Sequence, residues 1–269
     1  MQGFRILSLC LLMALLLSAC ATSPTGRKQV IFSSDAELEA QSAQAFAQMK
    51  ASTPLMTDRA TIDYIACVAN AIVDELEPPH DSLNWEMAIF DEDAINAFAM
   101  PGGKIGVFKG ILKAAQDQDQ LAAVIGHEIA HVTARHSAER ASRAVTTGVG
   151  IQVAAVLLGA GHSGATYTAY EALNAGAQLG IMLPFNRGQE SEADVVGLEY
   201  MARAGFDPRA SVPLWQNMSK ESGSAAPPEF LSTHPSSSTR IDQLVGQFGS
   251  SLKLYNEAQA AGKRPNCQR

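Results

Sequence analysis

The stretch Gly126-His127-Glu128-Ile129-Ala130-His131 places two histidines four residues apart, with a glutamate directly after the first. On an α-helix the two histidines lie on one face, and the glutamate projects about 60° away from His131. Two imidazoles in this arrangement can bind one metal ion, while the carboxylate accepts a proton from water at the metal. The pattern therefore predicts a metal-dependent hydrolytic site, with His127 and His131 as ligands and Glu128 as general base.

A third ligand is expected from residues 187–204, which have the apolar spacing of a helix. Glu190 and Asp194 lie four residues apart on one face of that helix, whereas Glu192 points about 200° away from Glu190. A catalytic zinc ion takes three protein ligands and leaves one position for water. We therefore expect Glu190 to bind the metal and Asp194 to orient a ligating histidine. The alternative is a solvated acidic helix face.

Three further polar residues each fit more than one role. His234 is a candidate to stabilise the oxyanion, or to act as an extra ligand that closes the water position, and its alternative is a structural histidine. Arg240 fits a pairing with Asp194, a contact with substrate, or an exposed position. His136 lies opposite His127 on a continuous helix, so we interpret it as a structural or supporting residue rather than a ligand.

These motifs together resemble the zinc metallopeptidase family of the CAAX prenyl protease, HtpX and the mitochondrial Oma-type proteases, in its soluble periplasmic or lipoprotein branch. The resemblance extends over roughly residues 35–245. It implies an α+β, mostly helical gluzincin-type domain with a small sheet beside the active-site helix, and one Zn²⁺ per chain. The stretches that carry it are His127-Glu128-x-x-His131, Glu190-x-Glu192-Ala193-Asp194, Thr233-His234-Pro235 with Arg240, Asn96-Ala97-Phe98-Ala99, Pro101-Gly102-Gly103 and Thr25-Gly26-Arg27.

The elements that must position these residues follow from hydrophobic spacing and turn signals. One long helix over residues 117–143 carries the paired histidines. Residues 144–182 are expected to form a hairpin of core helices; the alternatives are a mobile flap over the site and a shallow membrane contact. Residues 34–250 are expected to form the peptidase domain, followed by a tail at 251–269. The other expected helices cover residues 34–50, 57–76, 187–204 and 208–220, a further helix contains Arg240, and the expected strands cover 85–90, 94–100 and 104–108.

The strand Lys104–Phe108 alternates Ile105 and Val107 with Lys104 and Gly106, as in a strand with one covered face. Its glycine would allow close approach of another backbone. We interpret it as a sheet edge that pairs with an extended polypeptide substrate. A plain interior hairpin is the alternative.

The N-terminus reads as an export signal. Arg5 precedes a short apolar run, Ile6 to Leu17, which is too short for a comfortable membrane span. The run ends in Leu17-Ser18-Ala19-Cys20, which resembles a bacterial lipobox and implies a lipid anchor on Cys20. We therefore expect residues 1–19 to be a signal peptide, residues 20–33 a tether, and the protein an outer-membrane lipoprotein facing the periplasm. The alternative is an ordinary signal peptide with Cys20 as a free thiol.

The two remaining cysteines, Cys67 and Cys267, are candidates for a disulfide, because an exported protein meets an oxidising compartment. The alternative is a buried Cys67 and a free thiol in the tail. Charge also limits the function. The chain has a formal net charge of −7, which argues against electrostatic binding of nucleic acid.

The sequence therefore predicts a zinc metalloendopeptidase of the cell envelope that acts on misfolded or misassembled proteins. The alternative is a chaperone-like assembly factor for outer-membrane proteins, with low or gated proteolysis.

Overall fold

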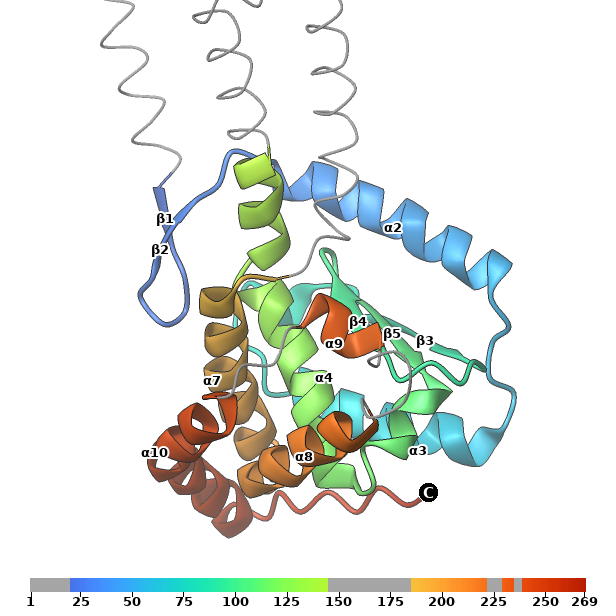
Figure 1. Ribbon diagram of the computed structural model, residues 1–269, viewed down its shortest axis with the longest axis vertical. Helices are drawn as coiled ribbons and strands as arrows, with labels where there is room; N and C mark the ends of the chain where they lie inside the picture. The colour runs from blue at the N-terminus through green and yellow to red at the C-terminus, as the bar shows by residue number, and fades with distance from the viewer. Residues whose placement is uncertain (1–19, 145–184, 222–228, 235–238) are drawn as a thin grey trace, which may run out of the picture. The chain divides into compact units, whose positions relative to one another are not determined.

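The computed structural model describes residues 20–144, 185–221, 229–234 and 239–269 (Figure 1). These residues are mostly helical with two small sheets, which confirms the predicted α+β class. The helices are α2 (Asp35–Ser52), α3 (Arg59–Val73), α4 (Gln118–Thr133), α7 (Arg187–Arg203), α8 (Ser211–Glu221), α9 (Glu229–Thr233) and α10 (Arg240–Ala260), with 3-10 turns η1 (His80–Ser82), η2 (Lys109–Lys113) and η3 (Pro208–Ala210). The strands are β1 (Cys20–Thr22), β2 (Lys28–Val30), β3 (Glu86–Phe90), β4 (Ala97–Met100) and β5 (Lys104–Phe108).

The chain divides into two compact units. One comprises Met1–Asp35 and Ser137–Leu183, and the other comprises Ala36–His136 and Pro184–Arg269. The predicted signal peptide and most of the predicted hairpin at 144–182 lie outside the described residues. Among the described helices, none combines the length and the apolar character that crossing a bilayer requires.

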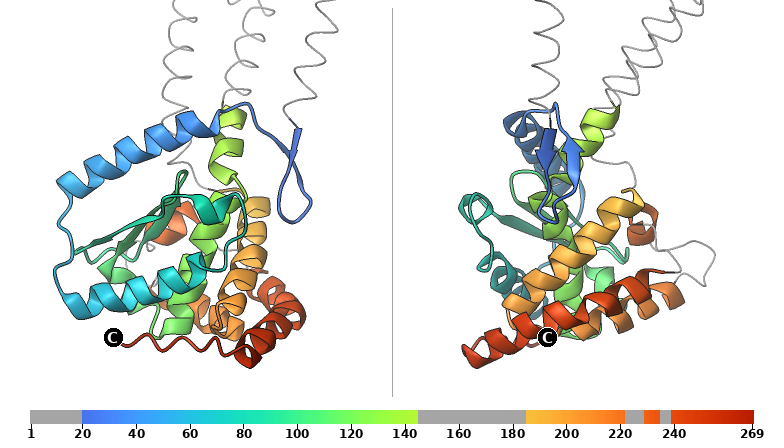
Figure 2. Two further views of the ribbon diagram at one scale, coloured as in Figure 1. Left: turned by 180° about the vertical axis from the view of Figure 1, so that it is seen from behind. Right: turned by 90° about the vertical axis from the view of Figure 1, so that its left-hand side faces the viewer.

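Helix α4 is the central element of the larger unit. It contacts α7, α3, α8 and β4 (Figures 1 and 2). Asp117 begins the helix by accepting a hydrogen bond from the amide of Gln120 at 2.7 Å, as an N-cap residue does. The side chains of Leu121, Ile125 and Ile129 are almost completely buried. This apolar face anchors the helix in the core and leaves its histidines turned toward α7.

Helices α4 and α7 approach so closely that their backbones touch at two glycines. A β-carbon on Gly126 would lie 2.8 Å from the carbonyl oxygen of Gly197, and one on Gly197 would lie 2.8 Å from the amide nitrogen of His127. Real β-carbons do not make contacts this short, so only glycine fits at both positions. Because Gly126 directly precedes His127, this contact sets the distance between the paired histidines and the acidic residues of α7.

The variant Gly197→Ala is expected to lose about 1–3 kcal/mol of unfolding free energy and to bind zinc more weakly, because the added methyl group forces the two helices apart. Denaturant unfolding and zinc titration measure the two effects. Gly249→Ala on α10 is the matched control, since nothing lies within 4 Å of the added carbon. Equal stability and zinc affinity in the two variants would contradict this interpretation of the helix contact.

The prediction of one helix over residues 117–143 is wrong. Helix α4 ends at Thr133, Arg135 adopts a positive φ of 54°, and residues 136–144 are again helical. A left-handed residue interrupts an α-helix, and it changes the direction of the side chains that follow. His136 is therefore not on the helical wheel of His127, and its position must be taken from the structure.

The sheet of the larger unit has the order β3-β5-β4, with β3 parallel and β4 antiparallel to β5. The prediction that Lys104–Phe108 is a sheet edge is therefore wrong, because β5 is hydrogen-bonded on both sides. Gly106 does not admit another backbone either; a β-carbon there would collide with the ring of Phe98, at 2.1 Å. The outer side of β3 is partly covered by residues 54–56, through the hydrogen bond from Met56 N–H to the carbonyl of Ile89. Strand β4 is the other edge of this sheet.

Residues 20–33, predicted to be a tether, instead contain an antiparallel hairpin. Cys20 pairs with Val30, and Thr22 pairs with Lys28. The turn between them closes because the hydroxyl of Ser23 accepts a hydrogen bond from the Arg27 amide. Arg27 also forms two hydrogen bonds to the carboxylate of the buried Glu139, at 2.8 and 2.7 Å. This pairing orders a segment whose composition alone is typical of a linker.

The C-terminal residues are also ordered. Helix α10 continues without a break through residue 250, so the predicted domain boundary falls inside a helix. The structure joins Cys67 and Cys267 in a disulfide, with Cα atoms 5.7 Å apart. The side-chain oxygen of Gln118 accepts a hydrogen bond from the amide of Cys267 at 2.8 Å. The tail is thereby fixed to α3 and to the first turn of α4.

Candidate active site

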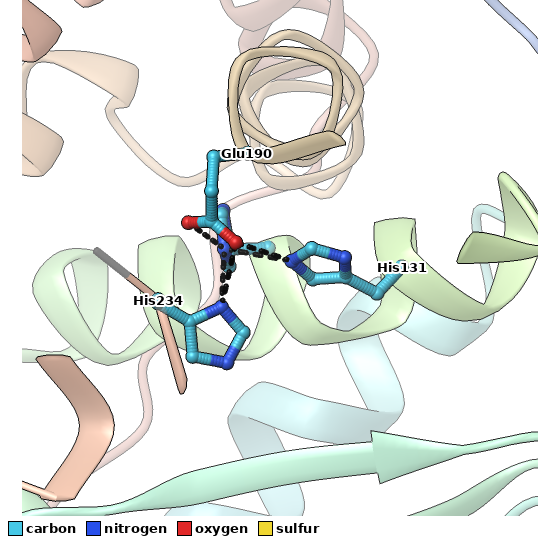
Figure 3. A group of neighbouring side chains, drawn as sticks. His131, Glu190 and His234 are labelled. Carbon is cyan, nitrogen blue, oxygen red and sulfur yellow. Dashed lines mark hydrogen bonds and ion pairs between the residues drawn. The ribbon is translucent and has the colours of Figure 1, made fainter. Parts of the chain in front are cut away.

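The predicted ligands meet at one buried point between α4, α7 and the residue after α9. The Nε2 atoms of His127 and His131 lie 3.0 Å apart, and each lies 3.5 Å from an oxygen of Glu190. His234 joins them, with its Nδ1 3.2 Å from His127 Nε2 and 3.1 Å from Glu190 Oε1. Figure 3 shows the side chains of His131, Glu190 and His234 converging.

The four side chains fit a zinc ion. Each is at most 4% exposed, and one donor atom from each lies within 4.8 Å of all the others. Ligands that bind zinc tetrahedrally at 2.0–2.2 Å lie about 3.3 Å from one another. The separations given above, 3.0 to 3.5 Å, match that spacing. Burying three imidazoles and a carboxylate together also requires a compensating interaction, which a bound cation supplies.

Glu128 lies beside this cluster, as the sequence predicts. Its side chain is 2% exposed, and its Oε2 accepts a hydrogen bond from the amide of Ala99 on β4, at 3.3 Å. Its Oε1 is buried without a hydrogen bond to any described group and lies 3.3 Å from His234 Nε2. Burial raises the pKa of the Glu128 carboxyl above its usual range. A carboxylate with a raised pKa and one oxygen without a hydrogen bond is suited to accept a proton.

The other side of His127 is held by a charged pair. Asp194 Oδ1 lies 3.0 Å from His127 Nδ1, which is the orienting contact expected from the sequence. Arg240 then binds both acidic residues of α7, at 2.6 Å to Asp194 and 2.9 Å to Glu190. Its guanidinium also stacks on Trp215, 3.4 Å from the ring centre. The sequence left three roles open for Arg240, and the structure shows the buried pairing with Asp194.

The two ligand histidines differ in protonation. Burial lowers the pKa of His131 well below its usual range, which keeps its imidazole neutral and able to bind a metal. Burial also lowers the pKa of His127, but hydrogen bonds to Asp194 and Glu190 outweigh burial and raise this pKa to about 9. The carboxylates around His127 therefore favour a positive charge at this point, and a divalent cation would provide one.

Sequence reasoning missed two aromatic residues beside the ligands. Phe185 stacks on His131 with ring centres 3.7 Å apart, and Phe230 stacks on His234 at 4.5 Å. His136 contacts the rear nitrogen of His131, which fits the supporting role expected for it, and Glu192 contacts His136. The aromatic residues gave no spacing signal. The histidine contact depends on the break in the helix at Arg135.

The fold and the site define a metallopeptidase whose possible ligands come from α4, from α7 and from the residue after α9. Comparison with known sequences agrees, and the chain belongs to peptidase family M48, whose profile matches residues 60–247. This result confirms the predicted family and the predicted class of enzyme.

Several named proteins are similar to this chain. Mitochondrial metalloendopeptidase OMA1 of Schizosaccharomyces pombe is 42% identical over 165 residues, which cover 60% of this chain and 46% of that protein. The beta-barrel assembly-enhancing protease of Yersinia pestis is 34% identical over 199 residues, covering 72% of this chain and 40% of that protein. The protein of the same name from Escherichia coli K12 is 31% identical over the same shares. The match spans less than half the length of each relative.

Proposed function

We propose that this chain is a zinc-dependent endopeptidase of the bacterial cell envelope that hydrolyses misfolded or misassembled proteins. The observation that carries the proposal is the buried set of His127, His131 and Glu190 with the carboxylate of Glu128 beside it. The similarity to proteins named metalloendopeptidases and to the beta-barrel assembly-enhancing proteases supports it. The signal-like N-terminus with a cysteine at position 20 supports the envelope location and the lipid anchor.

His127, His131 and Glu190 would hold the zinc ion, whose chemistry when bound is Lewis-acid polarisation of the scissile carbonyl and activation of water. Glu128 takes the proton of the attacking water through its Oε1 and passes it to the leaving amine. The amide of Ala99 holds the second oxygen of Glu128 and so fixes the direction of the first. Asp194 and Arg240 hold the ring of His127 in the orientation that binding requires.

The position of β4 indicates how a polypeptide substrate would bind. The amide of Ala99 points away from β5 and toward Glu128, so the free edge of β4 faces the catalytic carboxylate. An extended substrate that adds to this edge would place its backbone beside Glu128. We therefore assign the expected substrate pairing to Ala97–Met100 in place of Lys104–Phe108.

A scan of N-methylated peptides tests the pairing. N-methylation of a substrate amide that bonds to β4 is expected to lower kcat/KM by roughly tenfold or more, because the ladder hydrogen bond is lost. The effect should alternate along the peptide, since only every second residue of a strand bonds to one neighbour. A uniform response at all positions would contradict the assignment.

The place of His234 favours a second candidate function. Its Nδ1 belongs to the cluster of possible ligand atoms, and a catalytic zinc site must keep one position open for water. With His234 bound, proteolysis would be gated, and the protein could act mainly as a chaperone-like assembly factor. A strain that lacks the gene separates the two functions. Rescue by wild type but not by the Glu128→Gln variant supports the peptidase, whereas full rescue by that variant supports the assembly factor.

A further inference from the structure

The rear nitrogen of His131 faces a second buried histidine. His131 Nδ1 lies 2.8 Å from His136 Nδ1, while its Nε2 faces the ligand cluster. His136 is fully buried, and its Nε2 lies 3.0 Å from an oxygen of Glu192. Glu192 itself is only 4% exposed. A buried line of three groups thus leads from the carboxylate of Glu192 to the possible metal ligand.

We propose that His136 and Glu192 form a two-bond relay that fixes the tautomer and the ring orientation of His131 and strengthens its binding of the metal. This inference rests on the proposed function, because it takes His131 to be a ligand. His136 and Glu192 touch neither substrate nor metal and act only through His131, so they are positioning residues.

The order of donors and acceptors follows from the ends of the line. A carboxylate can only accept a hydrogen bond, so the Nε2 of His136 carries a proton and donates a hydrogen bond to Glu192. In the proposed relay His136 carries this one ring proton, so its Nδ1 accepts, and the Nδ1–H of His131 is the donor it faces. The Nε2 of His131 is left with its lone pair, directed at the cluster. The relay therefore selects the one neutral tautomer of His131 that can bind a metal.

The interruption of the helix at Arg135 makes the relay possible. Without the positive φ of 54° at this residue, His136 would continue around α4 and point away from His131. Gln189 holds the backbone after this interruption by donating a hydrogen bond to the carbonyl of His136, at 3.4 Å. The first turns of α7 thus fix both the backbone and the side chain of His136.

Helix α7 supplies an acidic residue to each ligand histidine of α4. Asp194 contacts His127 directly, at 3.0 Å, and Glu192 reaches His131 through His136. These two acidic residues lie two positions apart, so they project to opposite sides of α7 and serve different histidines. The relay explains why Glu192, which cannot face the metal together with Glu190, is nevertheless buried.

The metal-free full-length protein tests the tautomer. The ¹⁵N shifts of histidine side chains are expected to show His131 protonated at Nδ1 and His136 protonated at Nε2 in wild type. In Glu192→Gln the amide can donate as well as accept, so both rings should become mixtures of tautomers. Glu199→Gln, which removes the same charge from the same helix, is the control and should keep the wild-type tautomers. Identical histidine spectra in wild type and Glu192→Gln would overturn the relay.

Zinc affinity is the second readout, measured by competition with a chelator. We expect Glu192→Gln to bind zinc about 10–100-fold more weakly than wild type and Glu199→Gln to bind as wild type does. If Glu192→Gln does not fold, His136→Gln is measured in its place. Its side-chain amide keeps one donor and one acceptor. We therefore expect a zinc affinity between that of the wild type and that of His136→Phe.

The relay and the proposed function fail in different ways. Wild-type zinc affinity in Glu192→Gln and in His136→Phe, together with normal proteolysis by the wild type, would overturn the relay and leave the peptidase intact. A wild-type protein that binds no zinc would overturn both.

Discussion

The Glu128→Gln variant is expected to lower kcat/KM for an unfolded polypeptide such as casein by about 10²–10⁴-fold, because the amide cannot accept the proton of the attacking water. The substitution preserves shape, and the amide oxygen can still accept the hydrogen bond from Ala99. The zinc content should therefore equal that of the wild type. Initial rates of fluorescent casein hydrolysis, measured with the zinc content of the same samples, check the prediction.

Glu257→Gln is the control for this change. Glu257 lies on α10 with an exposed side chain, which forms a 3.9 Å ion pair with Lys253 on the same helix. We expect this variant to cleave at the wild-type rate. Retention of full activity in Glu128→Gln would show that another group transfers the proton, and it would remove the basis for the proposed mechanism.

Replacing Arg240 by leucine is expected to lower the free energy of unfolding by about 3–5 kcal/mol. Arg240 is 3% exposed and pairs with Glu190 and Asp194, which are buried as well. Removing the guanidinium leaves two buried carboxylates close together without the cation that pairs with both. It also removes the stacking on Trp215. Denaturant unfolding of the full chain measures the effect.

Arg203→Leu is the matched control, because Arg203 pairs with an exposed carboxylate, Glu77, at 2.9 Å. Exposed pairs contribute little, so a change within about 1 kcal/mol is expected there. Arg240→Lys should lie between the two, since a lysine keeps the charge but cannot bind two carboxylates and stack at once. Equal stability of Arg240→Leu and Arg203→Leu would show that the buried pairs do not stabilise the fold.

The two pairs of site residues were predictable because helical geometry relates the members of each pair. His127 and His131 share a face of α4, and Glu190 and Asp194 share a face of α7, whatever the rest of the fold does. The same spacing rule placed Glu192 away from the metal. These features depend on residues at most four positions apart.

The features that were not predicted depend on contacts distant in the sequence. The strand order β3-β5-β4 is not encoded in the alternation within Lys104–Phe108, so an interior strand was read as an edge. Arg240 lies 46 residues from Asp194, and nothing local shows that it is buried. The break at Arg135 has no glycine or proline to mark it. A supporting role for His136 was expected, but its contact with His131 depends on that break and was not predicted.

The zinc content of the purified full-length protein, measured with casein hydrolysis on the same samples, tests the central claim most directly. The proposed site predicts one zinc ion per chain in wild type and in Glu128→Gln, with hydrolysis only in wild type. It also predicts loss of both zinc and hydrolysis when His127 and His131 are replaced by alanine. A wild-type protein that cleaves casein equally well without zinc, or a double histidine variant that keeps one zinc ion per chain, would contradict the proposed metal site.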